Sequence, residues 1–116
     1  MKTNKKETNT TVTYKGEEYA LVFNLNVMEI IQEEYNSVGE WASAMESAEP
    51  RAKDIKFGFT AMLNEGIDIY NETHEEKRDF LTEKQVGRII SELGLMETAE
   101  QIKNTVIEST KSDEKN

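Results

Sequence analysis

The single histidine, His74, is the residue whose chemistry first suggests a functional site, because three carboxylates lie within two residues of it. These are Glu72, Glu75 and Glu76. Imidazole and carboxylate groups bind divalent metal ions, but a metal site needs several such ligands held in fixed positions. Residues 71–79 show no helical or strand periodicity, so we predict a charged loop here. A lone histidine in such a loop predicts no metal site.

The chain also lacks the residue combinations that nucleophilic catalysis requires. A serine, threonine, cysteine or lysine nucleophile needs a neighbouring base, whereas this chain has no cysteine and only one histidine. The six glycines are dispersed along the chain, so they form no phosphate-binding loop. We therefore predict no catalytic residue and no bound cofactor. The sequence favours a binding protein rather than an enzyme.

One aromatic residue does not fit the apolar face of the helix that contains it. Residues 54–70, wound at about 100° per residue, place one apolar stripe on a single side, formed by Ile55, Phe59, Met62, Leu63, Gly66 and Tyr70. We expect this stripe to lie in the core. Phe57 lies on the opposite, polar side, so it packs under a second element or contacts another molecule. We predict that Phe57 and Ala61 contact a partner or another protomer of a homo-oligomer.

A second candidate contact lies in the short helical segment from Trp41 to Met45. These two residues are one helical turn apart and form a small hydrophobic surface. The alternative is that they cover the edge of the core, because a single tryptophan usually buries its ring and leaves its N–H hydrated. We retain Trp41 and Met45 as partner-binding candidates beside Phe57 and Ala61.

Charge and composition exclude several classes of protein. The 116 residues include 14 basic and 23 acidic side chains, for a net charge of −9. Binding to a phosphate backbone requires a basic surface, so we predict no nucleic-acid partner. No apolar run approaches the roughly 18 residues of a membrane span, and residues 1–10 lack the apolar segment of a signal peptide. We therefore expect a cytosolic protein that contacts no membrane.

The pattern of elements predicts a mainly α (α+β) fold, in which an N-terminal β-hairpin precedes a compact domain of four to five helices. We expect a disordered tail at 1–10, a single domain at 11–110 and a polar tail at 111–116. Predicted strands at 11–14 and 19–23 precede helices at 27–38, 41–45, 54–70, 83–93 and 97–110. Asn24 and Asn26 are both candidate caps of the helix at 27–38. Asn26 with Glu29, and Thr82 with Gln85, are candidate capping boxes. Gly39 and Gly94 are predicted helix ends.

Three segments carry a resemblance to a known family. YKGEEYALVFNLNVMEIIQEEY, DIKFGFTAMLNEGIDIYNE and FLTEKQVGRIISELG resemble, in this order, tail assembly chaperones of long-tailed bacteriophages and of prophages of Gram-positive bacteria. The resemblance covers residues 13–110. It implies a protein of the host bacterial cytoplasm that binds the tape measure protein, helps recruit tail tube subunits and is absent from the mature virion. It supplies no pattern of site residues.

The family also commonly makes a longer product by ribosomal slippage near the end of the reading frame. The ending Glu114-Lys115-Asn116 is compatible with a slippery A-AAA-AAC heptamer and also with an ordinary polar tail, so the sequence leaves both alternatives open and the codons of the gene would decide between them. Two other functions remain as alternatives. An acidic phage-encoded DNA mimic would carry rows of carboxylates on one face, and a structural head–tail connector subunit would remain in the finished particle.

Overall fold

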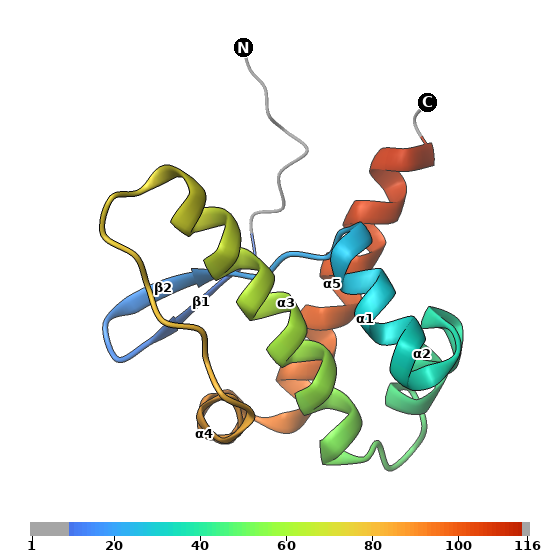
Figure 1. Cartoon of the computed structure of the whole chain (residues 1–116). Helices are drawn as coiled ribbons and strands as arrows, with labels where there is room; N and C mark the ends of the chain where they lie inside the picture. Colours follow the sequence, from blue (N-terminus) through green and yellow to red (C-terminus); the bar gives the residue numbers. More distant parts are fainter. Residues whose placement is uncertain (1–9, 115–116) are drawn as a thin grey trace.

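The computed structural model describes residues 10–114, with side chains described as far as Lys111. As predicted, a two-stranded antiparallel hairpin precedes a set of helices, and the fold is mainly α with a small sheet (Figure 1). The elements are β1 (Thr11–Tyr14), β2 (Glu17–Ala20), α1 (Leu25–Tyr35), α2 (Val38–Met45), α3 (Ala52–Thr73), α4 (Glu83–Leu93) and α5 (Leu95–Glu114). Residues 1–9 of the tail predicted at 1–10 lie outside the described residues, as do Lys115 and Asn116.

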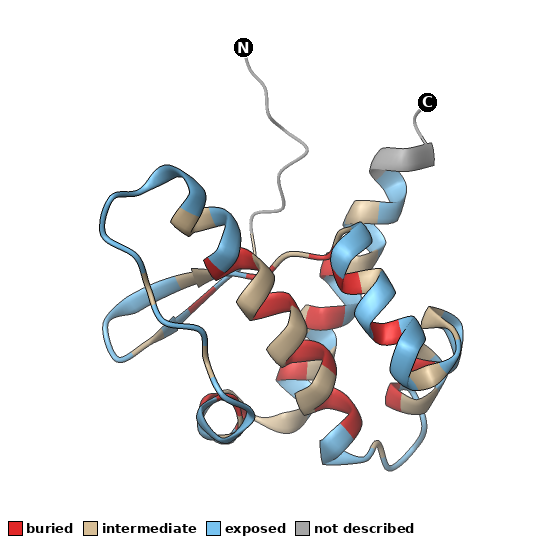
Figure 2. Cartoon of the chain, viewed as in Figure 1, coloured by how far each residue is buried: buried red, intermediate tan, exposed pale blue. Residues whose placement is uncertain are grey.

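Helix α3 is the element against which the rest of the chain packs. Strand β2 and helices α1, α2, α4 and α5 all contact it, and Figure 2 shows buried positions along its length. The predicted apolar stripe is confirmed as core at Ile55, Phe59, Met62, Leu63 and Gly66, whereas its last member, Tyr70, is only half-buried. Burying one large apolar side chain stabilises a fold by about 1.5–3 kcal/mol. This stripe therefore anchors the other elements.

Two glycines allow neighbouring elements to approach the α3 backbone closely. A Cβ atom added at Gly58 would lie 2.1 Å from Cζ2 of the Trp41 ring on α2. One added at Gly66 would lie 2.3 Å from the carbonyl oxygen of Ala20 in β2. Neither distance is compatible with a side chain, so the absence of a Cβ brings α2 and the hairpin against α3.

The hairpin turn is tighter than the predicted four-residue connection. Lys15 and Gly16 both have positive φ values, 53° and 81°, which is typical of a two-residue type I′ turn. β2 therefore begins at Glu17 and pairs only as far as Ala20. The following apolar residues, predicted as strand up to Phe23, leave the hairpin and contribute Leu21 and Phe23 to the core.

The structure selects one of the two predicted caps of α1 and corrects two other predicted helix boundaries. Asn24 is the cap, because its side-chain oxygen accepts the N–H of the residue three positions later at 3.2 Å, so the Asn26–Glu29 capping box does not form. The helix ends at Asn36, whose φ of 75° is one that asparagine tolerates. Gly39 does not end it but lies inside α2, which Ser37 caps through its hydroxyl. The predicted piece at 41–45 is thus the second half of a longer helix.

The later helices match their predicted starts and stops more closely. The Thr82–Gln85 capping box is confirmed, and Gly94, with a φ of 101°, ends α4. α3 runs to Thr73, so the loop that was predicted at 71–79 starts only at residue 74. α5 continues through Glu114, past the predicted end at residue 110. None of the helices in residues 10–114 combines the length and apolar character that a membrane span requires.

Candidate partner-binding surfaces

The four predicted contact residues belong to two different depressions in the molecular surface. Trp41 and Met45 line a groove between α2 and α5, which we call the α2–α5 groove. Phe57 and Ala61 line a depression between α1, α3 and the segment that precedes α4, which we call the Phe57 hollow. The two have no lining residue in common. The structure therefore separates the candidates into two surfaces.

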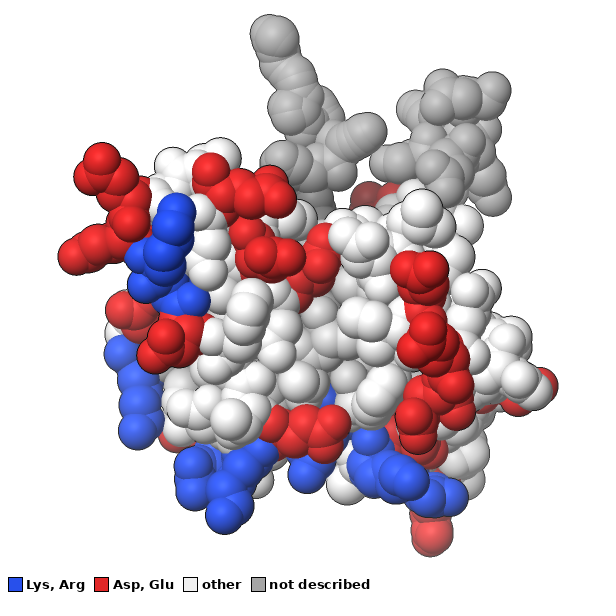
Figure 3. All heavy atoms as spheres, viewed as in Figure 1, with Lys and Arg blue, Asp and Glu red and all other residues white. Residues whose placement is uncertain are grey.

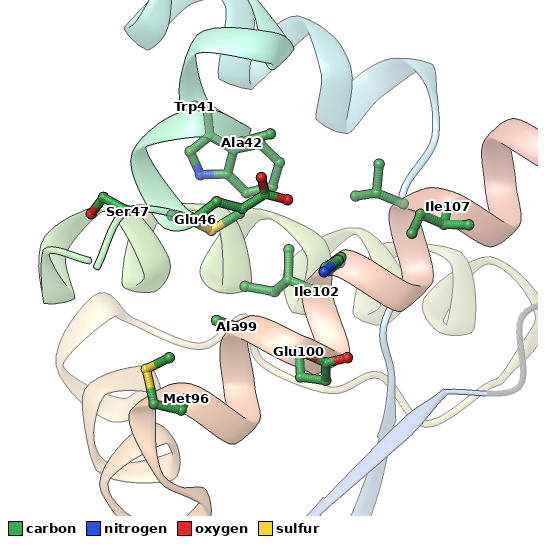
Figure 4. A pocket seen from close by; sticks show the side chains of 12 residues that line it. Trp41, Ala42, Glu46, Ser47, Met96, Ala99, Glu100, Ile102 and Ile107 are labelled. Atoms are coloured by element: carbon green, nitrogen blue, oxygen red, sulfur yellow. The ribbon is translucent and has the colours of Figure 1, made fainter. Parts of the chain in front are cut away.

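The α2–α5 groove has a volume of about 330 Å³ and is mostly apolar. Figure 4 shows residues of α2 on one side of it and residues of α5 on the other. Trp41, Met45 and Ile102 form its buried floor. Met96 and Ile107 lie along α5 at its edge, with 63% and 45% of their surface exposed. An apolar floor with exposed apolar edges is suited to contact with another apolar surface.

Trp41 itself is buried. Its relative exposure is 0%, its ring packs against Gly58, and its Nε1–H donates to the carbonyl oxygen of Asp54 at 3.1 Å. The alternative, that Trp41 belongs to the edge of the core, is observed for the ring, but its N–H is bonded to the backbone rather than hydrated. Because its only donor is already used, the ring contributes an apolar floor to the groove and no polar group.

Asp54 joins three helices beneath the groove. Its carboxylate Oδ1 accepts a hydrogen bond from the Tyr35 hydroxyl at 2.5 Å, and Asp54 is buried, with 5% of its surface exposed. It lies in the first turn of α3, where the helix dipole favours a negative charge. Burial, reinforced by the bond to Asp54 and its charge, raises the pKa of Tyr35 well above the ordinary tyrosine range. This pair holds α1 against α3, while Trp41 ties α2 to the same turn.

The Phe57 hollow has a volume of about 410 Å³ and is flanked by two exposed apolar side chains, Ile30 and Phe80. Phe57 is half-buried, and its ring contacts the Tyr35 ring at a centroid distance of 5.7 Å. One side of the ring therefore packs under α1, as the first predicted role requires, and Phe57 also lines the hollow. Its contact with another molecule stays a prediction. Figure 3 shows an uncharged area over the middle of α3 with acidic side chains on either side.

Sequence reasoning missed the most exposed members of both surfaces. Met96 and Ile107 belong to an apolar stripe at helical spacing in α5, together with Ala99, Ile102 and Val106, but the core covers only part of that stripe. The available signal was Lys103, a charged residue that interrupts this narrow stripe. Phe80 is an aromatic residue at the end of a charged loop, and Ile30 flanks the apolar face of α1. Each of these two residues is an apolar side chain outside the main apolar stripe of its segment.

His74 has a structural role at the end of α3. Its Nδ1 lies 2.9 Å from the carbonyl oxygen of Tyr70, and the two rings stack at a centroid distance of 3.6 Å. This bond requires the proton on Nδ1, and it satisfies one of the last carbonyls of the helix. Within the described part of the chain, no group of three or more histidine, cysteine, aspartate or glutamate side chains is placed to hold a metal ion.

Comparisons of the chain with protein-family models, with curated proteins and with solved structures give no match.

Proposed function

We propose that this protein is a phage tail assembly chaperone that binds an amphipathic helix of the tape measure protein in the α2–α5 groove. The observation that carries the proposal is the groove itself, which exposes Met96 and Ile107 above a buried apolar floor. The order of the three segments in the sequence that resemble this family is the second support.

The length of the groove suits a helical partner. Its lining residues on α5 extend from Met96 to Ile107, which at 1.5 Å per residue corresponds to about 16 Å, or three helical turns. A partner helix that presents apolar residues at i, i+3, i+4, i+7 and i+11 would cover this distance. Met45 and Met96 add flexible thioether side chains that adapt to different partner surfaces.

The acidic character of the chain fits the proposed role. A tape measure protein that is not yet enclosed exposes apolar helical stripes, which promote aggregation. A small protein that covers such a stripe while contributing a net charge of −9 would keep the complex soluble. In this proposal the protein acts in the host bacterial cytoplasm, assists recruitment of tail tube subunits and then leaves the assembly.

The test uses the only tryptophan of the chain as a reporter. Trp41 lies in the floor of the groove, so binding of a tape measure segment should change its emission. Ile107→Asp should weaken binding at least tenfold, because a carboxylate would enter an apolar contact. Ile69→Asp is the matched control, since Ile69 is exposed to almost the same extent, 43% against 45%, and lines neither surface.

Three results would contradict the proposal. Equal affinity of the Ile107→Asp and Ile69→Asp variants would exclude the groove as the binding site. Salt-sensitive binding to a nucleic-acid-binding protein, competed by duplex DNA, would favour the DNA mimic. Recovery of the chain from purified virions by mass spectrometry, in amounts expected of a subunit, would favour the head–tail connector.

A further inference from the structure

The Phe57 hollow is an apolar surface that the chain itself leaves uncovered. Phe57 and Ala61 are half-buried in it, whereas Ile30 and Phe80 are 43% and 55% exposed. They come from α3, α1 and the segment before α4, so the hollow exists only in the folded protein. It is separate from the α2–α5 groove, and its interpretation does not depend on the function proposed for that groove.

The hollow is held in shape by specific interactions. The amide of Asn64 on α3 donates to the carbonyl oxygen of Leu81 at 2.9 Å and accepts from its N–H at 2.8 Å. This pair of bonds fixes the segment next to Phe80 against α3. On the other side, Phe57 is supported by the Tyr35 ring. A surface already held in its binding conformation loses less entropy when a partner binds.

The charged side chains that line the hollow all have the same sign. They are Glu65, Asp68 and Glu83, and no lysine or arginine lines it. Among residues 10–111, whose side chains are described, the one salt bridge joins Arg78 to Glu17. The carboxylates of the hollow are therefore not neutralised by basic groups of the same chain. A partner that supplies cations at this position would gain complementary electrostatic interactions.

We propose that the Phe57 hollow binds an amphipathic helical segment of a partner protein in which lysine or arginine residues border an apolar stripe. The stripe would pack on Phe57 and Phe80, and the cations would lie against Asp68 and Glu83. A symmetric dimer through this face is disfavoured, because a two-fold axis brings the same patch of both copies together. It would place like-charged carboxylates opposite one another without basic groups between them. The same repulsion disfavours nucleic acid and anionic membranes.

The test is a titration of the full chain with two synthetic peptides, monitored by calorimetry and by amide chemical shifts. The first peptide is an acetylated and amidated amphipathic helix with leucines on one face and lysines along its borders. The second carries glutamate in place of each lysine. We expect the lysine peptide to bind at the hollow, with an affinity that falls as salt is added, and the glutamate peptide to bind at least tenfold more weakly.

Two pairs of variants separate this site from general attraction to an acidic protein. Asp68→Lys should weaken the lysine peptide about tenfold, whereas Glu92→Lys, an equal charge change at an exposed position outside the hollow, should have little effect. Ile30→Asp should reduce binding, whereas Ile69→Asp, at the same exposure of 43%, should not. The second pair keeps the site testable if Asp68→Lys impairs folding.

Specific outcomes would overturn the inference. Equal losses in Asp68→Lys and Glu92→Lys would show a general charge effect. Shift changes confined to the α2–α5 groove would place the peptide at the other surface. A dimer in sedimentation experiments that Ile30→Asp dissociates and Ile69→Asp does not would show that a second copy occupies the hollow.

Discussion

The substitution Gly58→Ala tests the packing on which the whole helical arrangement depends. The added methyl group would lie 2.1 Å from Cζ2 of Trp41, whereas ordinary contact begins near 3.4 Å. The ring would have to retreat by roughly 1.3 Å to reach that contact distance. It is fully buried and is held by its bond to Asp54, so we expect it to resist this movement. α2 and α3 must separate instead.

The expected cost follows from two opposing terms. Replacing glycine by alanine inside a helix stabilises it by up to about 1 kcal/mol. Forcing an additional methyl group into a well-packed core costs about 1–3 kcal/mol, and the rigid tryptophan ring favours the upper end. The net loss in the free energy of unfolding should be about 2 kcal/mol, a large fraction of the total for a domain of this size.

Gly87→Ala is the matched control for this measurement. Gly87 lies within α4, and the nearest atom to an added Cβ is the flexible Lys56 Cδ at 3.6 Å. Here only the helix propensity changes, so the variant should be more stable than wild type by about 0.5–1 kcal/mol. Urea denaturation followed by far-UV circular dichroism and by Trp41 emission would measure both variants. If Gly58→Ala is as stable as Gly87→Ala, the ring is not locked against α3 and the reasoning is refuted.

Three further predictions test other parts of the structure. Phe59→Ser removes a fully buried ring and should lower the free energy of unfolding by about 3–5 kcal/mol. Phe57→Ser should lower it clearly less and should weaken partner binding. Equal losses of stability in the two variants would place Phe57 in the core. Because folding raises the pKa of Tyr35, its contribution is present below the ordinary tyrosine pKa of about 10 and is lost as pH rises further. The free energy of unfolding should therefore decline more steeply above this pH in wild type than in Tyr35→Phe, and equal slopes would contradict the assignment. Thr82→Ala removes the capping box and should lower the free energy of unfolding by about 1 kcal/mol. Thr82→Ser keeps a hydroxyl group and should retain most of this stabilisation. A Thr82→Ala protein as stable as Thr82→Ser would show that the cap contributes little.

Local sequence patterns were sufficient to predict the fold class and most of the helices. The apolar stripe of α3, the Thr82 capping box and the glycine that ends α4 are all defined by residues within a turn or two of one another. Their periodicities and caps depend on the chain's own backbone geometry. For that reason a hairpin followed by helices could be predicted from the sequence.

Contacts between distant segments decided what local patterns left ambiguous. Asn24 and Asn26 were both suitable caps for α1 by residue type, and Asn24 is the one that caps it. The amide groups of both also donate to the carboxylate of Glu65, some forty positions away, which ties the start of α1 to α3. Asn71 similarly binds the backbone N–H and carbonyl of Arg78 and shapes the loop after α3. Arg78 in turn reaches the hairpin through Glu17. None of these bonds has a local sequence signal.

The same distinction applies to the candidate binding surfaces. The sequence identified Phe57 as an apolar residue on a polar face, because that judgement requires only the helical period. The sequence could not predict which of Trp41 and Met96 is more exposed to solvent, because both are apolar residues of amphipathic helices. Gly58 admits the Trp41 ring against α3 and buries it, while the packing of α5 leaves Met96 63% exposed. Exposure depends on how much surface neighbouring elements cover, so only the tertiary structure decided which apolar residues remain available to a partner.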